Sequence, residues 1–251
     1  IKLMSNKLKY IAENLDSLKI GLDETFKFNC TMCGKCCIDR EDILLKPKDL
    51  FIACKELSMK PYDFIQKYCE CYVGDSSRLP ILRLKLVGQN KRCPMLRGSR
   101  CAIHNAKPEV CAMFPIGRCM TIDKDNVGDS KAMSGIIYIN QKVNCGDKKA
   151  THTVREWLSK FNIPVDDEYF IEWHKVISSI SLDIHELEMY TPEKIKDLMY
   201  NNLFAFLYVD YDLDKDFMKQ FKLNAEKATG MVKYIRKVAE DVKKELNGGK
   251  S

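Results

Sequence analysis

The sequence predicts an α+β fold that is mostly helical, with a small cysteine-rich half containing short strands followed by an all-α half. Two observations support this division: all twelve cysteines precede residue 146, and the remainder carries apolar residues at helical spacing. With 45% hydrophobic residues, the 251-residue chain can build a packed core. We therefore expect a cysteine-cluster domain at 1–150 and a helical region at 151–251 that packs on it.

The first half is predicted to contain short elements around its cysteines. Apolar residues at helical spacing predict helices over 4–20, 48–57 and 61–72. Alternating apolar and polar residues predict strands over 25–28, 43–45, 79–87 and 136–139. Gly88-Gln89-Asn90 predicts a hairpin turn, and 93–119 is expected to be irregular because prolines and glycines interrupt it.

The second half is predicted to be helical, and most of its helices have a recognisable start. Thr153 and Glu156 form a capping box, in which each side chain caps the other residue's backbone. Asp166, Thr191 and Asp214 begin three further helices. A terminal helix carries an apolar stripe of Met231, Ile235, Val238 and Val242. We expect this stripe to pack in the protein's own core, with an interface as the alternative.

The cysteine content requires either disulfides or metal. Disulfide frameworks are typical of small secreted domains, whereas metal sites are typical of reducing compartments. The start of the chain, IKLMSNKLKYIAEN, is polar and has no signal-peptide core. No apolar run reaches the roughly 20 residues that cross a membrane. We therefore expect a cytoplasmic, metal-binding protein without a membrane partner.

The stretch CTMCGKCC at 30–37 is the densest part of this pattern. Cys30, Cys33 and Cys36 follow C-x2-C-x2-C, the opening of a bacterial ferredoxin run, and are assigned to one centre. Side chains of adjacent residues diverge in an extended chain, so Cys37 is expected to face a different centre or to be a buried thiol. The remaining ligands must come from farther along the chain, where the candidates are Cys93, Cys101, Cys111, Cys119 and Cys145.

The spacing also bears on which metal is bound. Three close cysteines with one distant partner favour a 4Fe–4S cluster. Zinc sites usually consist of C-x2-C pairs separated by a spacer, so zinc is the first alternative, and mononuclear iron is another.

Several spaced motifs together resemble a known family. CTMCGKCC is followed by Cys-Pro-Met-Leu at 93–96, Cys-Ala-Ile at 101–103, Pro-Glu-Val-Cys at 108–111 and Phe-Pro at 114–115, and Cys145-Gly146 precedes a capped helix. This combination, over about residues 26–161, resembles the YkgJ-type CxxCxxCC cysteine-cluster family, described as zinc- or iron-chelating, which includes flagellin lysine N-methylases. The resemblance implies two four-thiolate sites, or one cluster with structural thiols. The implied metal ligands are Cys30, Cys33, Cys36, Cys37, Cys93, Cys101, Cys111 and Cys145.

Three functions are compatible with these motifs. The first is a metal-cluster protein in electron transfer or metal handling. The second, implied by the resemblance, is a protein lysine N-methylase-like enzyme, which would need S-adenosylmethionine. The glycines do not cluster as in the usual loop for that cofactor, so whether the chain is an enzyme stays open. The third is a structural zinc domain that presents a partner-binding module. The expected partner is a protein substrate or a redox protein, nucleic acid is not expected, and the oligomeric state stays open.

Charge is unevenly distributed around the cysteines. Residues 78–118 contain nine Lys or Arg and one acid, Glu109. The stretch is interpreted as a solvated face, with compensation of thiolate charge and an acidic or nucleic-acid partner as alternatives.

Three smaller patterns are interpreted as peripheral. The aspartates at 210–216 lack the glycine and glutamate of a calcium loop. Cys69 and Cys71 are expected to fill the core as free thiols. His104 is expected at the surface, with a ligand role as the alternative.

Overall fold

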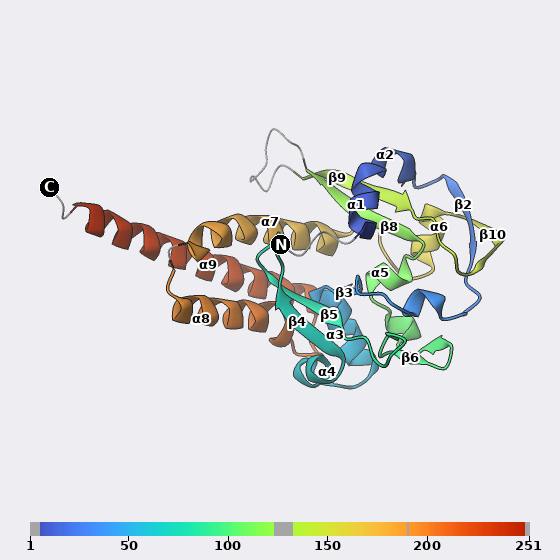
Figure 1. The fold of residues 1–251 in the computed structure, drawn as a ribbon, viewed down its shortest axis with the longest axis horizontal. Helices are drawn as coiled ribbons and strands as arrows, with labels where there is room; N and C mark the ends of the chain where they lie inside the picture. Colours follow the sequence, from blue (N-terminus) through green and yellow to red (C-terminus); the bar gives the residue numbers. More distant parts are fainter. Residues whose placement is uncertain (1–5, 123–132, 190, 249–251) are drawn as a thin grey trace.

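The computed structural model describes residues 6–122, 133–189 and 191–248, and confirms the predicted α+β class (Figure 1). Its helices are α1 (Asn6–Glu13), α2 (Leu15–Leu18), α3 (Pro47–Glu56), α4 (Pro61–Tyr68), α5 (Glu109–Ala112), α6 (Val154–Ser159), α7 (Glu168–Glu188), α8 (Glu193–Phe204) and α9 (Phe217–Gly248). Its strands are β1 (Lys19–Ile20), β2 (Thr25–Asn29), β3 (Leu44–Leu45), β4 (Cys69–Val73), β5 (Pro80–Leu84), β6 (Leu96–Arg97), β7 (Arg100–Cys101), β8 (Ile116–Ile122), β9 (Met133–Asn140) and β10 (Asp147–Thr153). The long helices α7, α8 and α9 lie side by side at one end, and the strands lie at the other.

The predicted helix over 4–20 is wrong at its C-terminal end. The side chain of Asn14 donates to the Tyr10 carbonyl at 2.9 Å at the end of α1, and only the short α2 follows. Lys19 and Ile20 then form β1 and pair with β9 in an antiparallel ladder. The long-range pairing therefore overrides the local helical pattern, which is a common outcome for short apolar runs.

A three-stranded sheet, ordered β3-β5-β4, forms around the alternating LPILRLKLV segment. Pro80, Leu82 and Leu84 of β5 are buried, as the period of two predicts. The predicted helix over 61–72 ends early, because 69–73 pairs with β5 as β4.

The long strands β8 and β10 were not predicted, and neither were the two-residue strands β6 and β7. β8 pairs with β9, and β10 pairs with β2, both antiparallel. β10 reads Asp-Lys-Lys-Ala-Thr-His-Thr, which lacks the apolar alternation of a half-buried strand. The β2–β10 pairing brings Asn29 opposite Asp147, which places Cys30 near Cys145.

The helical half follows its capping signals with three corrections, the first being that α8 begins at Glu193 with Pro192, not Thr191, at its cap position. The capping box is confirmed: Glu156 N donates to Thr153 Oγ1 at 3.1 Å, and Thr153 N donates to Glu156 Oε2 at 2.9 Å. Asp167, not its neighbour at 166, caps α7 by accepting from Phe170 N at 3.3 Å. The helix predicted to begin at 214 begins at 217 and is continuous with the terminal helix, so both form α9. None of the helices described is long and apolar enough to cross a membrane.

Two hydrophobic cores hold the elements together. The larger packs α3, α4 and β5 against α7, α8 and α9, with Phe64, Leu82, Ile180, Leu203 and Phe221 among its buried members. The smaller packs β2, β8 and β9 against α6, with Phe26, Ile116, Tyr138, Val154 and Trp157. Each core draws residues from both sides of position 150, so the two predicted regions share their interiors.

A buried ion network joins the cysteine-rich half to the helical half. Arg118 on β8, whose side chain is 1% exposed, binds Glu109 of α5 at 2.5 Å and Asp167, the cap of α7, at 2.6 Å. Its guanidinium carbon also lies 3.9 Å from the centroid of the Phe170 ring. Glu109 binds Lys46 as well, at 2.8 Å, and these two cations hold the pKa of its carboxyl at about 2 despite burial, which alone would raise it. One arginine therefore fixes three elements relative to one another.

Replacing this arginine should be costly. In Arg118→Ala, two buried carboxylates lose their shared partner, so the free energy of unfolding should fall by about 3–5 kcal/mol. The control is Arg155→Ala, which removes an exposed ion pair with Asp23 and should cost about 0–1 kcal/mol. Urea unfolding followed by circular dichroism measures both, and equal losses would contradict the role assigned to Arg118.

Candidate metal centre

One cavity gathers every cysteine implied as a metal ligand. It has a volume of about 280 Å³, and its wall includes Cys30, Cys33, Cys36, Cys37, Cys93, Cys101, Cys111 and Cys145. The other four cysteines lie outside this lining: Cys54, Cys69, Cys71 and Cys119. The cavity therefore separates the eight cysteines of the family pattern from the four outside it.

The CTMCGKCC loop forms one side of the cavity. It leaves β2 at Asn29 and turns back through two residues with positive φ, Met32 at 51° and Gly34 at 72°. Gly34 is suited to this conformation because it has no Cβ. The loop then forms the 3-10 turn η1 (Lys35–Cys37). Cys30 and Cys33 remain exposed, whereas Cys36 and Cys37 are half-buried, so the loop runs from the surface into the cavity.

The expectation that Cys36 and Cys37 diverge is wrong. Their sulfurs lie 3.9 Å apart, because a helical turn, unlike an extended chain, allows adjacent side chains to face the same side. Two thiolates on one tetrahedral zinc ion, with Zn–S of about 2.3 Å, would lie about 3.8 Å apart. The geometric reason for assigning Cys37 to a separate centre therefore disappears, although the assignment itself stays a prediction.

Ionisation of this pair is asymmetric. The hydrogen bond from the Cys37 thiol, with nearby Arg40 and Lys107, lowers the pKa of Cys36 to about 6 although burial opposes it. The same hydrogen bond, together with burial, raises the pKa of Cys37. The pair therefore holds one proton between its two sulfurs near neutral pH, and a bound cation would replace it.

Backbone N–H groups point at several of the sulfurs. The N–H groups of Gly146 and Lys35 donate to Cys33 and lower its thiol pKa. Cys93 accepts from the N–H of Met95 and that of Leu96, although burial raises its thiol pKa overall. Cys101 likewise accepts from the N–H of Ile103, and burial again raises its pKa. Such donors favour thiolate over thiol and are the contacts that tune bound iron–sulfur clusters.

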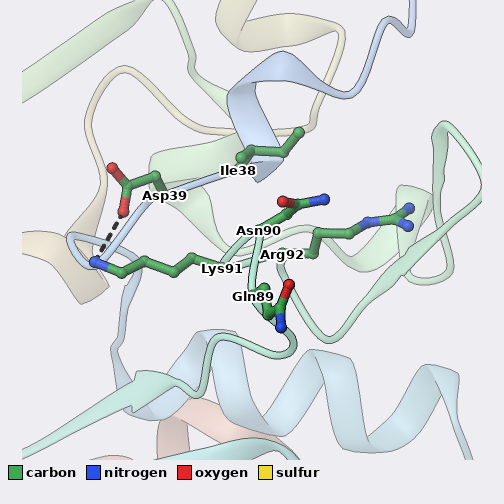
Figure 2. A pocket seen from close by; sticks show the side chains of 6 residues that line it. All are labelled: Ile38, Asp39, Gln89, Asn90, Lys91 and Arg92. Carbon is green, nitrogen blue, oxygen red and sulfur yellow. Dashed lines mark ion pairs between the residues drawn. The ribbon is translucent and has the colours of Figure 1, made fainter.

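The 88–92 turn holds Cys93 beside the cysteine loop. Figure 2 shows this turn next to Ile38 and Asp39, with Lys91 paired to Asp39 at 3.2 Å. Asp39 N donates to the Lys91 carbonyl at 2.9 Å, and Cys93 N donates to the Cys37 carbonyl at 2.8 Å. Two segments more than 50 residues apart in sequence are thereby tied together at the cavity.

Cys111 is positioned by a buried carboxylate. It lies on α5, whose first backbone N–H, that of Glu109, donates to Asp49 at 2.8 Å. Asp49 also accepts from Lys46 N at 2.9 Å, within the capping box of α3. Burial raises the pKa of the Cys111 thiol. Asp49 therefore connects α3 to the helix that carries a candidate ligand, a role that the sequence did not indicate.

Cys145 is placed by a glycine that tolerates no side chain. Gly146 has a φ of +68°, and a Cβ there would lie 2.5 Å from the Asn29 carbonyl oxygen and 2.7 Å from the Phe28 ring. This close approach sets Cys145 against the start of the cysteine loop. Burial and the neighbouring thiols of Cys36, Cys33 and Cys30 raise the pKa of Cys145 to about 11.

Charge interactions among the eight thiols form two overlapping groups. Cys145 interacts with Cys30, Cys33 and Cys36. Cys37 interacts with Cys93 and Cys111, and Cys111 with Cys101. The first group is therefore Cys30, Cys33, Cys36 and Cys145, and the second is Cys37, Cys93, Cys101 and Cys111. Cys36 also interacts with Cys37, Cys93 and Cys101, so it stands where the two groups meet.

Positive charge accompanies the thiols. Arg40, Arg100 and Lys107 line the cavity, whereas none of its described lining residues is Asp or Glu. Elsewhere the basic stretch forms local contacts: Arg78 pairs with Glu188 at 2.5 Å and Arg83 with Glu70 at 2.6 Å. The interpretation of residues 78–118 as a solvated face is therefore incomplete. This stretch includes the buried Arg118 and two cations beside the thiols, Arg100 and Lys107.

Four aromatic residues that the sequence pattern did not assign to the site form part of the cavity wall. Phe28, Phe114, Trp157 and Phe161 line the cavity, and the indole N–H of Trp157 donates to the Met113 carbonyl at 2.9 Å. Two of them lie beyond residue 150, on or just after α6. Trp157 and Phe161 are four residues apart, the spacing of one helical face, but this spacing alone indicates packing in a hydrophobic core and not a place in the cavity wall.

The residues interpreted as peripheral from the sequence lie in three different places. Cys69 is buried in the larger core, as expected, but Cys71 is exposed on β4. His104 lies at the mouth of the cavity with its side chain largely exposed, and the partial burial of its ring, together with Lys107, lowers its pKa. The aspartate loop at 210–216 lies before α9, outside the cavity.

The donor set fits a soft metal. Thiolates select zinc and iron–sulfur clusters over magnesium or calcium, which prefer oxygen ligands. Among the described residues, no three Cys, His, Asp or Glu side chains converge closely enough to hold one ion as they stand.

The crowded glycine gives a direct test of the Cys145 position. Gly146→Ala should reduce metal bound per chain, because the new methyl group pushes the 145–147 segment away from Cys33. The control is Gly88→Ala, whose φ of +71° is similar but whose Cβ would meet nothing within 4 Å. Both variants carry a backbone cost of about 1–2 kcal/mol. Elemental analysis after anaerobic purification measures the difference, and equal metal loss would contradict the placement.

Comparison with known proteins bears on this cavity. Residues 29–133 match the model of the CxxCxxCC family, described as a putative zinc- or iron-chelating domain. Neither curated proteins nor solved structures give a significant match. The match includes seven of the eight lining cysteines, and Cys145 follows it. The predicted resemblance is therefore confirmed over residues 29–133, which are similar to the zinc- or iron-chelating domain of the CxxCxxCC family and support metal binding in general.

Proposed function

We propose that the cavity binds iron–sulfur, as 4Fe–4S, and that the protein serves in electron transfer or metal handling. The observation that carries the proposal is the arrangement of eight thiols around about 280 Å³, with three cations and, among the described lining residues, no carboxylate. Two groups of four thiols could each hold one cluster. A cluster needs cysteine ligands that are spread apart, because each thiolate binds a different iron.

Access to the surface supports a redox role. Cys30 and Cys33 are exposed, so a centre held by the first group would lie close to solvent and to a docked protein. All four thiols of the second group are half-buried. A route from an exposed centre to a shielded one suits transfer of single electrons, with a redox protein as the proposed partner.

A structural zinc site is the second candidate, and one distance favours it. The Cys36 and Cys37 sulfurs lie 3.9 Å apart, close to the spacing of two thiolates on one zinc ion. In that case the chain would be a colourless, redox-inactive partner-binding domain. Measurement of iron, sulfide and zinc in anaerobically purified protein, with a visible spectrum, decides between the two: iron with sulfide supports the cluster, and stoichiometric zinc overturns it.

The division into two groups predicts partial losses. Cys145→Ser and Cys111→Ser should each remove about half of the iron, because each variant breaks one four-thiolate set. The double variant should remove nearly all of it. The matched control is Cys119→Ser, a half-buried thiol outside the cavity, which should keep its full iron content. Loss of the same iron from both single variants, with no further loss in the double variant, would contradict two centres.

A redox role predicts sensitivity to the nearby cations. Lys107 lies close enough to affect Cys36 and Cys101. Lys107→Gln should make the reduction potential more negative, because a positive charge favours the reduced, more negative cluster. Protein-film voltammetry measures the shift, with Lys149→Gln on the exposed part of β10 as the control. Absence of any reversible one-electron signal would exclude the redox role while leaving metal binding intact.

A further inference from the structure

A second hollow lies at the opposite end from the strands. A groove of about 1380 Å³ is bounded by α8, α9 and the C-terminal end of α7. Its lining includes exposed apolar side chains: Met189 (70% exposed), Tyr234 (69%), Leu198 (59%), Val238 (44%) and Ile195 (42%). Single exposed apolar residues are ordinary, but a contiguous group of this kind marks an interaction site.

The stripe expected to pack in the protein's own core is therefore only partly covered. Met231 and Ile235 are half-buried against the larger core, while Val238 is exposed in the groove. The side chain at 242 lies outside the described residues. Burial of α9 comes instead from the adjacent face, with Phe221, Ala228 and Val232.

The charges of the groove balance. Lys227 and Arg236 contribute two positive charges, and Glu186 and Glu240 two negative ones. Arg236 is already paired with Glu186 at 2.9 Å and Glu240 at 3.1 Å, and with Asp183. A neutral apolar groove of this kind does not select an anionic ligand. It suits an amphipathic helix of mixed charge.

The chain itself carries such a helix. Lys222 pairs with Glu168 at 2.6 Å and Arg236 with Asp183, so α7 and α9 run parallel. α7 ends five residues after 183, whereas α9 continues twelve residues after 236. By this count α9 extends about seven residues farther, or about 10 Å, and Figure 1 shows it reaching past both neighbouring helices.

We propose that this groove is the interface of a two-fold dimer, in which α9 of a second copy lies antiparallel to α9 and against α8. The surface is self-complementary, as an isologous interface requires: each copy supplies both a groove and a projecting helix. Lys233 and Lys237 precede Asp241 in sequence, and all three side chains are exposed. Antiparallel pairing about this region brings the basic part of one helix beside the acidic part of the other and opposes the helix dipoles. The inference is independent of which metal is bound.

The experiment is sedimentation equilibrium of the full-length, metal-loaded protein over a wide concentration range. The wild type should weigh twice its 29.0 kDa chain. Leu198→Glu, at a groove residue that is 59% exposed, should weaken dimerisation roughly a hundredfold, because it would bury an unpaired charge. The matched control is Leu182→Glu on α7, 49% exposed and outside the groove lining, which should remain dimeric.

A charge exchange tests the direction of pairing without touching the apolar groove. Lys233→Glu should weaken the dimer about tenfold, and adding Asp241→Lys should restore it. A wild type that is monomeric at every concentration would overturn the proposal, and so would equal effects of the two leucine variants. A monomer that binds neutral phosphatidylcholine vesicles would assign the groove to lipid instead.

Discussion

The repulsion that would arise if eight closely placed thiols ionised together is the constraint around which the cysteine-rich half is organised. Two charges about 4 Å apart repel by about 4 kcal/mol at the effective dielectric of a protein surface. Cys36 and Cys37, at 3.9 Å, therefore share one proton, with the pKa of Cys36 lowered to about 6 and that of Cys37 raised. The backbone N–H groups at Cys33, the cations Arg40 and Lys107, and the exclusion of carboxylates from the described cavity wall all reduce the same repulsion. A bound metal would complete this compensation, because each thiolate bond replaces a proton by a cation.

The supports of the cavity lie in the helical half as much as in the cysteine-rich half. Cys111 depends on α5, and α5 is held by Asp49 and by the Glu109–Arg118 ion pair. Arg118 continues the network to Asp167 at the start of α7. Together with the aromatic wall from α6, these contacts make residue 150 a boundary of composition rather than of packing. The two halves thus share one interior, and the position of a candidate ligand depends on residues that carry no sulfur.

The sequence correctly predicted those features that depend only on interactions between neighbouring residues. The capping box at Thr153 and the alternation through β5 were readable because each involves only neighbouring residues. The same local logic failed at Lys19–Ile20 and at Cys69–Val73, where pairing with distant strands determined the structure. The ligand set was readable from cysteine spacing and family resemblance, and the structure places all eight in one cavity. The division of those thiols into two groups could not be predicted from the sequence, because it depends on which loops fold against each other. The hydrogen bond from Cys93 N to the Cys37 carbonyl and the close packing at Gly146 are two such loop contacts.

The position of the two hydrophobic cores relates metal binding to folding. Classical zinc fingers are unfolded without metal because they have too few apolar residues to form a core. Here the larger core has many fully buried side chains, among them Phe64, Leu82, Ile180 and Leu203, each 0% exposed. Its members Leu84, Met95 and Ile103 also line the cavity, whereas Cys30 and Cys33 are exposed on the cavity rim. The fold therefore has its own source of stability, and this core supports the inner wall of the cavity. The exposed end of the CTMCGKCC loop, between β2 and the turn η1, is an exposed part of the cavity wall, whereas the inner wall is shared with both cores. The inner ligands therefore depend on the folded cores, and the outer pair, Cys30 and Cys33, depends on the loop.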